Sequence, residues 1–139
     1  MDISLINKNA IVCGSTQGIG ESSAILLASL GANITLIARN ETKLLDVISE
    51  LDTSKGQTHS FIAIDFRDSE KLKKEVDLLT GTYHILINNT GGPAAGPIAD
   101  AQIESFELAF KMHLINNQIL VQKVVDGMKK ERYGRIINI

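Results

Sequence analysis

Three glycines lie close to the N-terminus, in the segment VCGSTQGIG from Val12 to Gly20. The segment follows a short apolar run and precedes a helical pattern, which predicts a turn that opens a helix. Glycine lets the backbone turn tightly and lets a ligand approach the main chain closely. Because unpaired N–H groups at a helix start bind anions, the segment favours a diphosphate site over a simple tight turn. The residues expected around the diphosphate and the adjoining ribose are Gly14, Ser15, Thr16, Gln17, Gly18, Ile19 and Gly20.

A single arginine, Arg39, follows the second β-rich segment, nineteen residues after Gly20 and with no acidic residue beside it. Dinucleotide-binding proteins carry an acid at this point for a ribose 2′-hydroxyl, or a base for a 2′-phosphate. The planar guanidinium suits a phosphate, whereas a merely solvated arginine at a helix start would oppose the helix dipole. Arg39 therefore favours NADP(H) over NAD(H).

Apolar strand patterns alternate with helical patterns along the whole chain. Strands are expected at 9–13, 33–38, 60–64, 83–88 and 134–139, and helices at 18–30, around 44–51, after Asp68, and from about 101 to 130 with a break near Asn116. In the first helix, Ile19, Leu26, Leu27 and Leu30 are expected to face the core. The alternation predicts an α/β fold, namely a Rossmann-like doubly wound parallel sheet. Its five strands are expected in the order 3-2-1-4-5 with helices on both faces, and ligands bind such sheets at the carboxyl ends of the strands.

The length, composition and net charge of the chain limit the class of protein to which it can belong. The chain has 139 residues, 22% of them charged, and a net charge of −2, so one domain is expected, and neither nucleic acid nor a membrane is indicated as a partner. The lone cysteine, Cys13, excludes an internal disulfide and favours a cytoplasmic location. Cys13 is interpreted as a buried apolar residue rather than a reactive thiol. The three histidines lack metal-ligand spacing, so no metal is expected.

Five motifs in order resemble the short-chain dehydrogenase/reductase family, in particular its reductases of the 3-oxoacyl-carrier-protein type. CGSTQGIG is similar to that family's T-G-x-x-x-G-I-G, with Cys13 in place of threonine, and INNTGG is similar to N-N-A-G. IDF, MHLINNQILVQKVVDGM and YGRIINI resemble the end of the third strand, the long helix and the fifth strand. The resemblance covers the whole chain.

The resemblance implies hydride transfer between a nicotinamide cofactor and a small carbonyl or alcohol substrate, in a homo-oligomer that is a dimer or tetramer. It places Asp65 against the adenine, Phe66 as a backbone contact, and Asn89 and Gly91 along the cofactor. Thr90 stands where the family usually has alanine.

The chain departs from the family at its catalytic groups. His113 aligns with the helix asparagine of the family's catalytic group, where it would hold a water or relay a proton, or would merely pack. The family's catalytic serine and its Y-x-x-x-K pair lie beyond Ile139, and neither Tyr83 nor Tyr133 has a lysine four residues later. Residues 1–139 are therefore expected to be a single NADP-binding domain, the N-terminal part of a longer reductase, and inactive alone.

Two other classes of function stay open at this point. One is a module that binds NADP(H) without turnover, which the missing tyrosine and lysine would favour. The other, more remote, is a different α/β nucleotide domain such as a methyltransferase.

Overall fold

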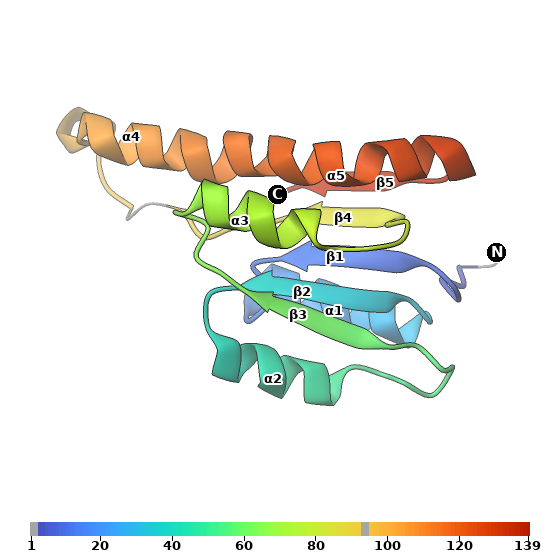
Figure 1. Cartoon of the computed structure of the whole chain (residues 1–139). Coiled ribbons are helices and arrows are strands. Elements are labelled where there is room, and N and C mark those ends of the chain that lie inside the picture. The colour runs from blue at the N-terminus through green and yellow to red at the C-terminus, as the bar shows by residue number, and fades with distance from the viewer. Residues whose placement is uncertain (1–2, 93–94) are drawn as a thin grey trace.

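Five parallel strands form one sheet in the order β3-β2-β1-β4-β5, with their carboxyl ends at the same edge (Figure 1). The computed structural model describes residues 3–92 and 95–139. The strands are β1 (Asn9–Cys13), β2 (Asn33–Ala38), β3 (His59–Ala63), β4 (Ile85–Asn88) and β5 (Arg135–Asn138). The doubly wound parallel sheet and its strand order are confirmed.

Helices cover both faces of the sheet (Figure 1). Helices α1 (Gly18–Ser29) and α2 (Glu41–Glu50) pack on one face, and α3 (Ser69–Asp77) and α5 (Asn116–Glu131) on the other. A short 3-10 turn, η1 (Ile98–Asp100), precedes α4 (Ile103–Phe110). Helix α4 passes through a π-helical turn, η2 (Lys111–Ile115), into α5, so the two form one long rod that reaches past the tips of the strands in Figure 1.

The central strand β1 is buried on both of its faces. Ala10 and Val12 belong to the cluster beneath α1 and α2, whereas Ile11 and Cys13 belong to the cluster beneath α3 and α5. Because successive side chains point to opposite faces, a strand covered on both sides must be apolar throughout. This requirement explains the unbroken apolar run in the sequence.

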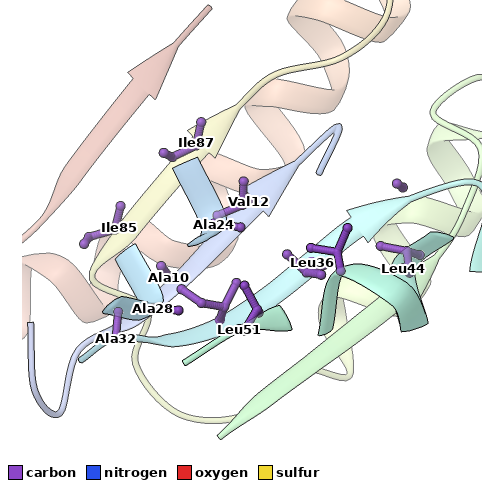
Figure 2. Close-up of a cluster of buried hydrophobic side chains, with 13 residues drawn as sticks. Ala10, Val12, Ala24, Ala28, Ala32, Leu36, Leu44, Leu51, Ile85 and Ile87 are labelled. Atoms are coloured by element: carbon purple, nitrogen blue, oxygen red, sulfur yellow. The ribbon is translucent and has the colours of Figure 1, made fainter. Parts of the chain in front are cut away.

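Helix α1 packs through its small residues, contrary to the prediction. Ile19 and Leu26 are 58% and 60% exposed, and Leu27 and Leu30 are only partly buried. The buried positions are Gly20, Ala24 and Ala28, spaced four apart along one side of the helix. Figure 2 shows Ala24 and Ala28 among the side chains of β1 and its neighbouring strands. Small side chains let the helix approach the sheet closely, so Ile19 and Leu26 are left outside, whereas Leu27 packs partly buried against the core cluster.

The other helix predictions are confirmed with small shifts at the ends. Leu44, Val47 and Leu51 are buried, as the second helical pattern predicts. Asp68 caps α3 by accepting a hydrogen bond from the Lys71 N–H at 2.9 Å. Strand β3 begins one residue earlier than expected, β4 begins two residues later, and the break in the last helix is the π-turn just before Asn116.

Several apolar side chains of the α4 region lie on the surface, among them Phe106, Phe110 and Leu114. The four residues of β5 are also exposed. These surfaces agree with an oligomer, which stays a prediction, as does the cytoplasmic location. In residues 3–92 and 95–139 we find no helix with the length and apolarity needed to span a bilayer.

Leu44 and Leu45 are adjacent on α2 but differ in burial, so their alanine variants test which face of α2 packs into the core. Leu44 is fully buried against the sheet, whereas Leu45 is 52% exposed. We expect Leu44→Ala to lower the free energy of unfolding by about 2–5 kcal/mol, because it removes buried methyl groups and leaves a cavity. We expect Leu45→Ala to change it by less than about 0.5 kcal/mol. Urea denaturation measures the free energy of unfolding of both variants. Equal losses of stability would contradict the burial of Leu44 in the core.

Candidate active site

A cleft of about 540 Å³ opens at the carboxyl ends of β1 to β4, where the strand order reverses between β1 and β4. Ligands of doubly wound sheets bind at such a reversal. Ten residues predicted to contact a cofactor line the cleft: Gly14, Thr16, Gln17, Gly18, Ile19, Arg39, Asp65, Phe66, Asn89 and Gly91. The structure therefore brings together four segments that are distant in the sequence. Ser15 and Gly20 lie behind the lining and are buried.

The backbone of the first turn is in direct contact with the helix and with the end of β4. A Cβ atom on Gly14 would collide with the Asn89 carbonyl and lie 2.8 Å from its side-chain Nδ2. A Cβ atom on Gly20 would collide with the Gly14 carbonyl and lie 2.8 Å from its carbonyl carbon. Gly14 also has φ +58°, a conformation that side chains disfavour. No residue other than glycine fits these two positions without moving the turn.

The third glycine of the turn faces open space. A Cβ atom on Gly18 would meet nothing within 4 Å, although Gly18 also has φ +58°. Gln17 precedes α1 but makes no side-chain cap, so the N–H groups of the first helical turn are left for another acceptor. By contrast, α2 is capped by Asn40 and α3 by Asp68. The start of α1 thus offers free N–H donors and a positive dipole end to the cleft.

Basic side chains surround one end of the cleft. Arg39 and Lys43, four residues apart, line it from the β2–α2 side, and Arg67 lines it from the β3–α3 loop. The carboxylate of Asp65 lies in that same loop and accepts the Arg67 N–H at 2.9 Å. Arg39 was predicted from the sequence, whereas Lys43 and Arg67 were not. Lys43 lies four residues after Arg39, in the first turn of α2, but no pattern in the sequence marks Lys43 or Arg67 as part of the site.

Thr90 and His113, two positions at which the chain departs from the family, contact each other. The Thr90 Oγ1 lies 3.1 Å from the His113 Nδ1, within hydrogen-bond distance. Thr90 lines the cleft, and His113 lies behind it on the π-turn, so the histidine reaches the cleft through the threonine. A side chain at Gly92 would lie 3.9 Å from the His113 Nε2. The two departures therefore form one unit next to the cleft.

Both tyrosines of the chain lie at the opposite edge of the sheet, before the strands β4 and β5. Tyr83 is buried, and its hydroxyl lies 3.2 Å from the Thr35 Oγ1. The ring of Tyr133 lies 4.5 Å from the Lys8 ammonium and 5.2 Å from the Arg135 guanidinium. Neither phenol lines the cleft, so neither is placed to act as its proton donor.

The other ionisable candidates have structural roles. His59 and His84 accept the backbone N–H groups of Ile34 and Asn9 through their Nδ1 atoms, and so hold neighbouring strands together. Burial raises the pKa of the Cys13 thiol to about 12, which keeps it protonated and unreactive. Cys13 is thus the buried apolar residue that we expected. The described residues hold no cluster of three or more potential metal ligands.

A family model described as short chain dehydrogenase matches residues 8–139. The chain belongs to the short-chain dehydrogenase family. It is 30% identical to a short chain dehydrogenase of Pseudocercospora fijiensis, over 97% of this chain and 45% of that protein. It is 28% identical to the 3-ketodihydrosphingosine reductase of Bos taurus, over 97% of this chain and 43% of that protein.

Solved structures of the family share the fold. The L-sorbose reductase from Gluconobacter frateurii complexed with NADPH and L-sorbose superposes with a TM-score of 0.85 and is 28% identical, over 98% of this chain and 53% of that chain. A metagenomic short-chain oxidoreductase in complex with NADP gives a TM-score of 0.83 at 28% identity, over 96% of this chain and 62% of that chain. This short-chain dehydrogenase chain spans about half the length of the curated relatives it matches.

Gly14 and Gly18 form a matched pair, because both have φ +58° but only Gly14 faces a collision. We expect Gly18→Ala to cost about 1–2 kcal/mol of stability, the strain of a side chain in the left-handed region. We expect Gly14→Ala to cost about 1–3 kcal/mol more, because the added methyl group displaces Asn89. Urea denaturation of the two variants measures the difference, and equal costs would contradict the close approach at Gly14.

Proposed function

We propose that this chain binds NADP(H) and that the whole protein is an NADPH-dependent carbonyl reductase of the short-chain dehydrogenase type. The observation that carries the proposal is the uncapped start of α1, which opens into a cleft with three basic side chains at one end. Free N–H donors suit a diphosphate, and the basic end suits a further phosphate. Family members solved with NADPH or NADP lend support.

We propose the following cofactor-binding roles for residues in and directly behind the lining of the cleft. The first turn, with Gly14, Ser15, Thr16, Gln17, Gly18, Ile19 and Gly20, holds the diphosphate and the adjoining ribose. Gly14 and Gly20 allow the close approach, and the open side of Gly18 leaves room for the anion. Asp65 and the backbone of Phe66 contact the adenine, and Asn89 and Gly91 line the path toward the nicotinamide.

The preference for NADP(H) over NAD(H) rests on charge. Arg39, directly after β2, is exposed beside the cleft, and Lys43 in the first turn of α2 lines the same cleft. A guanidinium and an ammonium both stabilise a dianionic 2′-phosphate, whereas a 2′-hydroxyl gains little from them. Asn40 between them is committed to capping α2 through the Lys43 N–H.

Hydride transfer to or from a carbonyl or alcohol carbon is the chemistry that the nicotinamide supplies when bound. The chain's own residues orient that ring and control protons beside it. We propose that His113, held by Thr90, holds a water or relays a proton where the family has an asparagine. The cavity residues that fix the substrate, and the main proton donor, belong to the rest of the longer reductase of which residues 1–139 form the N-terminal part. The substrate is a small molecule, and the whole protein is a homo-oligomer.

Arg39→Ala tests the 2′-phosphate assignment. We expect the dissociation constant for NADPH to rise about tenfold to a hundredfold, because a charge-assisted hydrogen bond to phosphate is lost. We expect the constant for NADH to change by less than about twofold. Calorimetric titration measures both, and Lys130→Ala, at the exposed far end of α5, is the control. Equal losses for the two nucleotides would contradict the assignment, and no binding of either would overturn the proposed function.

The proposed role of His113 is tested by comparing its replacement with alanine and its replacement with asparagine, the residue that the family carries at this position. In the whole protein, we expect His113→Ala to lower kcat about a hundredfold, the usual contribution of a group that positions or transfers a proton. We expect His113→Asn to keep most of the activity, and both variants to bind NADPH as the unchanged protein does. Steady-state kinetics measures this. Full activity of His113→Ala would contradict a role in proton transfer and would show that His113 only packs.

A further inference from the structure

Asn116 is a fully buried polar residue that the proposed function does not use. It is the first residue of α5, directly after the π-turn η2. Its side-chain amide has both ends bonded. The Nδ2 donates to the Phe66 carbonyl at 2.6 Å, and the Oδ1 accepts from the Ser69 hydroxyl at 2.6 Å. A buried amide satisfied at both ends holds its partners in one arrangement.

One partner, Phe66, lies within the loop that walls one side of the cleft, and the other, Ser69, directly follows that loop. Residues 65–67 line the cleft, and Ser69 begins α3. Inside the loop, Asp65 accepts the backbone N–H groups of Arg67 and Asp68 through its carboxylate and its carbonyl. These contacts are local and fix the curvature of the loop, but they do not fix its distance from the rest of the cleft. At the start of the loop, the Ile64 N–H donates to the Ala38 carbonyl at 2.8 Å, and the Phe66 ring is buried in the core cluster beneath α3 and α5, so these contacts hold the loop to the sheet. The bond from Asn116 to the Phe66 carbonyl joins the loop to the helix instead.

The backbone of Asn116 closes the π-turn at the same time. Its N–H donates to the Lys111 carbonyl, five residues earlier, which is the bond that defines a π-turn. One helical turn before Asn116, Met112 lines the cleft, and Leu108 lines it one turn earlier still. The same residue thus joins the Phe66 loop to the helix that supplies the facing wall.

We infer that Asn116 is a positioning residue of the nucleotide site, which sets the spacing between the adenosine-side loop at Asp65–Arg67 and the helix wall at Met112. The inference rests on the proposed NADP(H) site. Without the amide, the Phe66 carbonyl and the Ser69 hydroxyl lose buried partners and the loop moves toward water. The diphosphate end of the site, built from the β1–α1 turn, does not touch Asn116 and keeps its geometry.

Asn116→Asp tests the inference, because it keeps the shape and the acceptor but replaces the N–H donor with an oxygen. We expect calorimetric titration with 2′,5′-ADP, which carries the adenine and the 2′-phosphate, to give a dissociation constant about tenfold higher. We expect NMR titration with reduced nicotinamide mononucleotide to give a constant within about twofold of the unchanged chain. Gln118→Glu, exposed on the same helix, adds the same charge and should leave both constants unchanged.

A second variant carries the test if Asn116→Asp does not fold, as judged by circular dichroism. Ser69→Ala removes one of the two bonds of the amide and adds no charge. We expect it to weaken 2′,5′-ADP binding about threefold and to leave the mononucleotide unaffected. Equal weakening of both probes, or of neither, would overturn the positioning role of Asn116. Failure of the unchanged chain to bind NADPH or 2′,5′-ADP would overturn the proposed function, and the inference with it.

Discussion

The contact on which the site depends is the meeting of three backbones at the first turn. The carbonyl of Gly14 lies where a side chain of Gly20 would be, and the carbonyl of Asn89 lies where a side chain of Gly14 would be. The start of α1, the end of β1 and the end of β4 are therefore as close as backbones allow. This approach brings the free N–H groups of α1 to the carboxyl edge of the sheet, at the reversal of strand order. Any side chain at the contact would move the helix start away from the cleft.

The same constraint extends along α1. A helix that starts in backbone contact with the sheet remains close to it, so its buried positions must also be small, and Gly20, Ala24 and Ala28 meet that requirement. Leu26 and Ile19 are excluded from the core for the same reason. The close packing of α1 and the anion site at its start are thus two consequences of one arrangement, and a larger residue at Ala24 would disturb both.

The sequence predicted the elements, their order and most of the cleft, because these depend on local patterns. Strand periodicity and helix caps predict the structure of short segments, and the glycine spacing predicts one turn. The burial of α1 could not be read in this way, since the prediction assumed that the largest apolar residues face the core. Lys43 and Arg67 were missed because exposed cations carry no periodic signal. Asn116 was noticed only as a break in the helix, since its partners Phe66 and Ser69 lie about fifty residues away.

The contact between Thr90 and His113 shows why residue-by-residue comparison with a family is incomplete. Taken singly, a threonine in place of alanine and a histidine in place of asparagine are two unrelated departures. In the structure, the side chain gained at Thr90 supplies the hydrogen-bond partner for the ring gained at His113. An alanine at the first position would leave the His113 Nδ1 without that partner, and a shorter side chain at the second would end further from the threonine. The two departures therefore form one polar pair, with Thr90 in the lining of the cleft and His113 bonded to it.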